Sequence, residues 1–235
     1  EAREVAAAAR AAGVTVVEGF HYLHHPVMRR LLELAGSGEL GTVTRVETRF
    51  RMPAPPDDDP RWSLDLAGGA VMDLGCYALH IQRMLGRHLG GEPTVVSGTG
   101  GERAGNPGVD EWVEAELAFP SGATGNAHCH MASDHWAVTA RVVGDRGEAT
   151  ACNVVLPHLD DRVLVTTGGV ERTEHLGTRA TYTYQLEALR SHLREGTPFP
   201  LDVDDAVATA ELIDATYRAA GFDPRPRHSP APAVT

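Results

Sequence analysis

The chain has 235 residues, of which 42% are hydrophobic, 23% are charged and 6% are aromatic, so it can bury a substantial globular core. Its formal net charge is −11 and no basic stripe offsets it, which argues against nucleic acid or an anionic membrane as a partner. No run of about 18 apolar residues is present, so no membrane-spanning helix is expected. Three cysteines without CxxC spacing favour free thiols and a cytoplasmic location.

The first 20 residues predict a helix followed by an apolar strand. Residues 1–12 are rich in strong helix formers, and Gly13 suits the position just after a helix end. Pro26 suits the first position of the next helix, where a missing N–H costs nothing. Apolar residues then recur at helical spacing, namely Met28, Leu31, Leu32 and Ala35. Residues 42–52 alternate as a half-buried strand does, and the proline-rich stretch 53–60 predicts a surface loop.

The most informative segment is 68–80, where the pair Gly68-Gly69 opens an apolar helix. That helix places Asp73, Tyr77 and His80 at i, i+4 and i+7, on one face and about one turn apart. A buried helix has little reason to align an acid, a phenol and an imidazole unless they meet a polar ligand. The alternative is a helix-start acid followed by two residues satisfied by core partners.

Beyond Gly86 the pattern changes to consecutive strands separated by short turns, which implies an antiparallel sheet. The expected strands are Thr94–Gly100, Glu111–Phe119, Ala123–Met131, Trp136–Val143, Glu148–Val155 and Arg162–Thr167. Two helices follow, with apolar stripes formed by Tyr182, Leu186, Leu189 and Leu193 and by Val203, Ala206, Ala210, Ile213 and Tyr217. The predicted fold class is α+β, a large, mostly antiparallel open sheet with helices on one face.

Two motifs resemble the glucose–fructose oxidoreductase/inositol dehydrogenase (Gfo/Idh/MocA) family. The segment 68–80 is similar to the family's GG(G/A)xxxDxGxY signature, and residues 18–41 are similar to its pattern of strand, ExF/Y, HP, helix and SGxLG. The resemblance extends from residue 1 to about 220. It implies hydride transfer between NAD or NADP and the carbinol or carbonyl of a sugar, polyol or dihydrodiol.

The same resemblance implies roles for single residues. Tyr77 aligns with the family's catalytic tyrosine, and Asp73 and His80 accompany it as catalytic candidates. A lysine of a Glu-Lys-Pro motif lowers the pKa of that tyrosine in relatives. Substrate-binding candidates are His21, Tyr22, Arg61 and Trp62, and Glu18 is a candidate for the cofactor. Leu23 replaces an arginine that relatives carry, which makes an anionic substrate less expected.

The resemblance also implies a domain division. Residues 1–20 are expected to be the end of a truncated dinucleotide-binding (Rossmann) domain, 21–222 a substrate-binding and oligomerisation domain, and 223–235 a disordered tail. Neither GxGxxG nor Glu-Lys-Pro occurs, so the chain is expected to be inactive alone. The alternative is a naturally truncated, non-catalytic oligomerisation or ligand-binding module. A homo-oligomer is expected through the open sheet face, with apolar positions on both faces of Val138–Val143 as support.

A metal site is not expected. The cluster His21, His24 and His25 and the pair His128 and His130 lack HExxH or CxxC spacing. GxSxG, Walker and SxxK motifs are also absent, so hydrolase and kinase functions have no support.

Overall fold

The computed structural model describes residues 1–227. The strands are β1 Val43–Arg51, β2 Thr94–Glu102, β3 Asp110–Ala118, β4 Thr124–His130, β5 Ala137–Gly144, β6 Gly147–Ala151, β7 Arg162–Thr167 and β8 Val170–His175. The α-helices are α1 Ala2–Ala12, α2 Pro26–Gly36, α3 Cys76–Gly86, α4 Thr181–Glu195 and α5 Val203–Ala219. A π-helical turn, η4 (Val71–Gly75), leads into α3, and 3₁₀ turns are η1 (His21–His24), η2 (Pro60–Trp62) and η3 (Leu64–Leu66).

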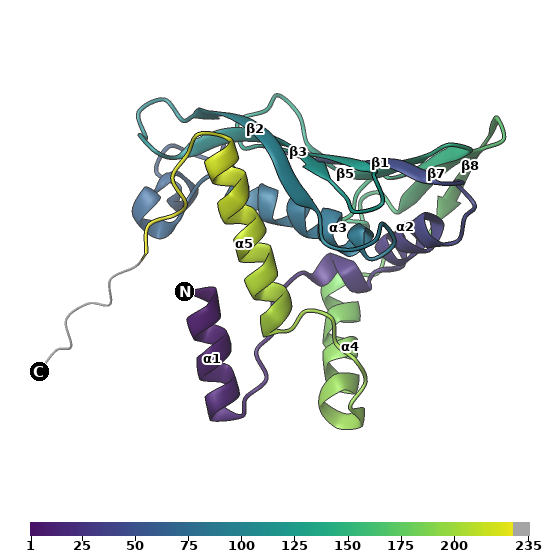
Figure 1. The fold of residues 1–235 in the computed structure, drawn as a ribbon, viewed down its shortest axis with the longest axis horizontal. Coiled ribbons are helices and arrows are strands. Elements are labelled where there is room, and N and C mark those ends of the chain that lie inside the picture. Colours follow the sequence, from purple (N-terminus) through teal and green to yellow (C-terminus); the bar gives the residue numbers. More distant parts are fainter. Residues whose placement is uncertain (228–235) are drawn as a thin grey trace, which may run out of the picture.

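The strands form one sheet in the order β2-β3-β4-β1-β5-β6-β7-β8, with α2 and α3 beneath one face (Figure 1). Among the described strands, β1 and β4 pair in parallel and every other neighbouring pair is antiparallel. The predicted fold class is therefore confirmed.

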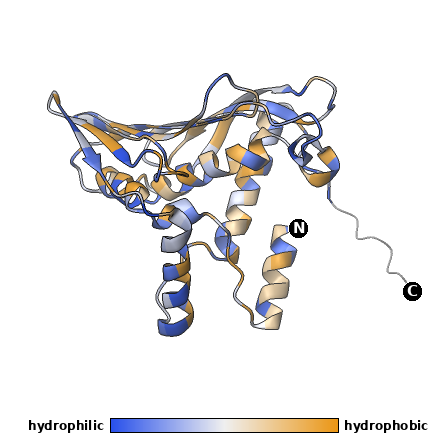
Figure 2. Cartoon of the chain, turned by 180° about the vertical axis from the view of Figure 1, so that it is seen from behind, coloured by the Kyte–Doolittle hydropathy of each residue, from blue (hydrophilic) through white to orange (hydrophobic). Residues whose placement is uncertain are grey.

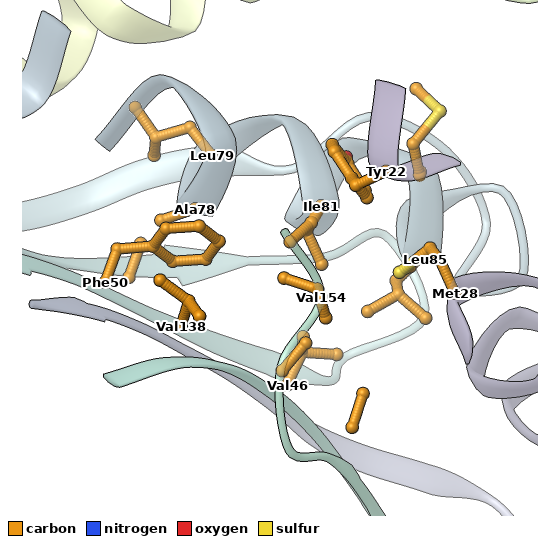
Figure 3. Close-up of a cluster of buried hydrophobic side chains, with 14 of the residues drawn as sticks. Tyr22, Met28, Val46, Phe50, Ala78, Leu79, Ile81, Leu85, Val138 and Val154 are labelled. Atoms are coloured by element: carbon orange, nitrogen blue, oxygen red, sulfur yellow. The ribbon is translucent and has the colours of Figure 1, made fainter. Parts of the chain in front are cut away.

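The core lies between α3 and the middle of the sheet (Figure 3). Alternate residues of β1 face the helices, and Val46 and Phe50 have no exposed surface. Ile81 and Leu85 project from α3 toward the sheet. Burying a side chain of this size stabilises the fold by roughly 1.5–3 kcal/mol, so this layer fixes α3 on the sheet.

The opposite face of the sheet is charged. Glu47 accepts from Arg45 at 2.8 Å and from Arg141 at 3.1 Å, and Arg141 also pairs with Glu148. Val138 and Val142 point into the core instead. Val143 lies on the outer face with Arg141, so apolar residues do occur on both faces of Val138–Val143, although the outer face also carries charge.

Two segments on the helix side leave apolar side chains exposed. Residues 14–20 are extended but form no ladder with any described strand, so the expected strand is not formed there. Val14 is 57% exposed. The stripe expected on α4 is also open, with Leu186 64% and Leu193 63% exposed. Figure 1 shows α1 and α4 projecting away from the sheet, and Figure 2 shows that α1 is largely apolar.

The described part of the expected tail makes specific contacts. Arg225 donates to the backbone oxygen of Gly108 at 2.8 Å and forms an ion pair with the buried Asp110. Residues 228–235 of that tail lie outside the described residues. No helix within 1–227 combines the length and apolar character needed to cross a bilayer.

Candidate active site

The glycine pair sets the start of the expected helix. Gly69 has φ of +126°, and a Cβ there would lie 2.0 Å from a carboxylate oxygen of Asp110. The other oxygen of Asp110 accepts from the backbone N–H of Val71 at 2.7 Å. The first turn that follows is π-helical, a conformation often found at functional sites. Asp110 therefore fixes the position at which the π-helical turn begins.

Tyr77 lies in a cup of aromatic rings. Its ring meets Phe20 edge-on at 5.3 Å between centroids and stacks with Phe50 at 5.9 Å. The rings of Tyr22 and His21 are 6.0 and 6.1 Å away. The side chain is half-buried, and its hydroxyl has no hydrogen-bond partner among the described residues. This polar atom is free to bind a ligand.

Burial, assisted by the nearby Cys76 and Tyr182, raises the pKa of Tyr77 to about 12. The phenol is therefore protonated at neutral pH and can donate a proton. To accept one it needs a neighbouring cation that stabilises the phenolate.

Asp73 lies nearer the surface, beside Arg61. The Nε atom of Arg61 donates to Asp73 at 3.0 Å, and its Nη1 atom donates to Asp59 at 3.1 Å. Together Arg61 and Asp73 border a surface hollow of about 250 Å³. Trp62 is 2% exposed and its indole N–H donates to the backbone oxygen of Pro55. Its side chain is therefore buried against the proline-rich loop.

His80 is fully buried, and its hydrogen bonds and ring contacts go to residues other than Tyr77. Its Nδ1 atom lies 2.5 Å from the hydroxyl of Tyr22, and its Nε2 atom lies 2.9 Å from Oδ2 of Asp205. Asp205 accepts through its other oxygen from Arg83 at 2.9 Å. We call Tyr22, His80, Asp205 and Arg83 the buried hydrogen-bond chain. The predicted column of Asp73, Tyr77 and His80 thus descends from the surface into the core.

The charged groups of the buried hydrogen-bond chain compensate one another. Burial opposes ionisation of Asp205, but hydrogen bonding from His80 and the charge of Arg83 hold its pKa below the usual value. Burial lowers the pKa of His80, so its ring is neutral at neutral pH. Arg83 also donates to both carboxylate oxygens of Glu92 at 2.9 Å.

His21 and Glu18 lie where the extended segment meets α4. Nδ1 of His21 is 2.7 Å from the hydroxyl of Thr181, and burial lowers its pKa to about 4. Burial and the charge of Asp205 raise the pKa of Glu18 to about 7. Its Oε2 atom is buried without a hydrogen-bond partner, although Gln185 donates to its backbone oxygen at 3.0 Å. The structure thus gathers His21, Tyr22 and Tyr77 and leaves Glu18 with an unused acceptor.

Sequence reasoning missed Phe20, Phe50 and Asp205. Asp205 lies in the first turn of α5, where an acid is usually explained by the helix dipole. The cap is supplied by Asp202, and Asp204 pairs with Arg10 at the surface. Asp205 is therefore the acid of this turn that is left to point into the core. Within residues 1–227 no three His, Cys, Asp or Glu side chains converge as metal ligands.

Comparison with known proteins gives consistent matches. A family model described as the GFO/IDH/MocA C-terminal domain matches residues 28–150. D-xylose 1-dehydrogenase (NADP(+)) 2 of Haloferax volcanii is 33% identical over 89% of this chain and 63% of that protein. The dTDP-3,4-didehydro-2,6-dideoxy-alpha-D-glucose 3-reductase of Streptomyces violaceoruber is 28% identical over 90% of this chain and 64% of its own length.

Among solved structures, aldose-aldose oxidoreductase from Caulobacter crescentus, complexed with glycerol, superposes with a TM-score of 0.83. It is 25% identical, and the match covers 94% of this chain and 66% of that one. The chain thus spans less than two thirds of the length of these relatives.

Proposed function

The chain belongs to the GFO/IDH/MocA family, and on that premise we propose that it is the substrate-side part of an NAD(P)-dependent oxidoreductase. The substrate is the carbinol or carbonyl of a sugar, polyol or diol, and the protein acts in the cytoplasm. When bound, the nicotinamide group supplies the acceptor or donor of the hydride. The observation that supports this best is the unpartnered hydroxyl of Tyr77 in its aromatic cup.

In this proposal Tyr77 transfers the proton. Its phenol donates to the developing alkoxide when a carbonyl is reduced and accepts from the hydroxyl when a carbinol is oxidised. The rings of Phe20 and Phe50 pack against the Tyr77 ring and hold the phenol in place. Asp73 and Arg61, which border the surface hollow, orient the remaining hydroxyls of the substrate.

The exposed apolar groups support a nucleotide-binding domain on the helix side. Val14, Leu186 and Leu193 lie open there, and the half-buried side chain of Glu18 offers a polar contact for the cofactor. Residues 1–20 then belong with that domain and residues 21–222 with the substrate domain. The intact mass of the native gene product tests this division, because a domain of about 120 residues adds roughly 12–15 kDa to the 25.1 kDa of this chain.

The assay for the proposal is reduction of NADP⁺ by D-xylose and by a panel of polyols and diols, using the native gene product. We expect Tyr77→Phe to lower kcat by about 10²–10⁴-fold, because a positioned acid or base contributes that much. Tyr184→Phe is the matched control, since Tyr184 is also a half-buried tyrosine but packs on His25. Turnover by Tyr77→Phe equal to that of the control would refute the role of Tyr77. No turnover of any substrate by the native protein would favour the non-catalytic binding module.

A further inference from the structure

The hydrogen positions in the buried hydrogen-bond chain follow from its charges. An ionised Asp205 only accepts, so Nε2 of His80 must carry the proton that lies between them. A neutral imidazole then has an acceptor at Nδ1, and the hydroxyl of Tyr22 donates to it. Arg83 holds Asp205 in place through its Nη1 atom, which donates to the carboxylate at 2.9 Å and to the backbone oxygen at 3.0 Å. Each link therefore has one direction.

The same chain touches the aromatic cup of Tyr77 at two points. The ring of His80 stacks on Phe20 at 4.1 Å with an interplanar angle of 11°, and Phe20 meets Tyr77 edge-on. Tyr22, the donor to His80, lies 6.0 Å from the Tyr77 ring. A rotation of His80 would therefore displace two of the rings that hold Tyr77. His80 and Tyr22 have 0% exposure, so neither reaches a ligand directly.

We propose that Tyr22, His80 and Asp205 are positioning residues that set the orientation of the Tyr77 phenol, an inference that rests on the proposed role of Tyr77. Asp205 fixes the tautomer of His80, and His80 fixes the direction of the Tyr22 hydroxyl. His80 is thus neither a substrate ligand nor a direct partner of Tyr77. Because α5 provides Asp205, this helix becomes part of the active-site support.

The first test reverses one link without changing its shape. In Asp205→Asn the amide oxygen can still accept from Arg83, while the amide nitrogen donates to Nε2 of His80. His80 must then carry its proton on Nδ1, and the hydroxyl of Tyr22 loses its acceptor. Asp204→Asn is the matched control, because Asp204 is the neighbouring acid on α5 and pairs with Arg10 at the surface.

The readouts on the 235-residue chain are NMR signals. We expect ¹⁵N shifts of His80 to show the Nε2–H form in the unmodified chain and the Nδ1–H form in Asp205→Asn. The ¹³Cζ signal of Tyr77 should shift in Asp205→Asn and stay unchanged in Asp204→Asn. Tyr22→Phe provides a second variant that keeps the ring, and it should shift the same Tyr77 signal. Combining it with Asp205→Asn should add nothing further, because both break one link.

In the native oxidoreductase we expect Asp205→Asn to lower kcat by about 10- to 100-fold, the range that a misplaced reacting group produces. KM should change by less than about twofold, because His80 and Asp205 do not touch the substrate. The proposal would be overturned if His80 were in the Nδ1–H form in the protein without substitutions. The proposal would also be overturned if the ¹³Cζ signal of Tyr77 shifted in neither Asp205→Asn nor Tyr22→Phe. If the native protein turns over no substrate, the proposed function fails. The NMR signal of Tyr77 still decides whether the buried hydrogen-bond chain positions that ring.

Discussion

Replacement of Arg225 by methionine should show how strongly the C-terminal segment is fixed to the π-helical turn that leads into α3. Arg225 forms an ion pair with Asp110, whose side chain has no exposed surface. The same carboxylate accepts from the N–H of Val71 at 2.7 Å and from the hydroxyl of Tyr217 at 3.2 Å. Removing one partner of a buried ion pair costs about 3–5 kcal/mol, because the other charge is left uncompensated. We expect Arg225→Met to lose about 3 kcal/mol of unfolding free energy at pH 8.

The loss should depend on pH in a defined direction. Burial raises the pKa of Asp110 from 3.8 to about 6, against the opposing effect of Arg225. The folded state then binds more protons than the unfolded state between these values, so its stability falls by about 3 kcal/mol as the pH rises from below 4 to above 6. At pH 5 Asp110 is mostly protonated and needs Arg225 less. The variant should therefore lose about half as much free energy, or less, at pH 5 as at pH 8.

Urea unfolding of the 235-residue chain at both pH values measures this difference. The control is Arg227→Met, because Arg227 pairs with Glu4 and both side chains are exposed. An exposed pair contributes at most about 1 kcal/mol, and no pH effect of this kind is expected for it. The reasoning fails if Arg225→Met loses no more free energy than the control does. It also fails if the loss is equal at pH 5 and pH 8.

Two further substitutions test the surroundings of the site. Gly69→Ala should lower the unfolding free energy by about 3 kcal/mol or more, because the new Cβ meets Asp110 and the backbone φ is +126°. Gly105→Ala also has positive φ but meets no atom within 4 Å, so urea unfolding should show a loss of only about 1 kcal/mol. Glu18→Gln should raise Tm above pH 7 and leave it unchanged at pH 5, because burial raises the pKa of Glu18 to about 7 and disfavours the charged form. The exposed Glu33→Gln is its control in the same thermal scan, and equal behaviour of the two variants would contradict the effect of burial.

Regular patterns of burial were predictable from the sequence. The helix that begins at Pro26 buries Met28, Leu31 and Ala35, as their spacing predicts. The strand β8 was missed because it lies at the sheet edge and pairs only with β7. Its residues are exposed or half-buried, so the alternation that marks a strand is absent.

For the candidate site residues, the shared side of the helix was predictable from the sequence, but their depth below the surface was not. Helical spacing placed Asp73, Tyr77 and His80 on one side, yet spacing says nothing about how far each lies below the surface. The π-helical turn before Tyr77 begins at a hydrogen bond to Asp110, 39 residues away. Likewise His80 is fixed by Asp205, 125 residues away. Such long-range partners leave no local periodic signal.

The place of β1 in the sheet also determines how the sheet can assemble. Strands β2, β3 and β4 form one meander and β5 to β8 form another, but β4 and β5 do not pair although they follow each other in the chain. β1 lies between them and supplies the ladders to both. The partners of Arg45 in these ladders are Thr124 and Val143, far along the chain, so closing them costs more loop entropy than any hairpin does. The two meanders can each form locally. A continuous sheet, and with it the surface against which α3 packs, exists only after β1 is inserted between them.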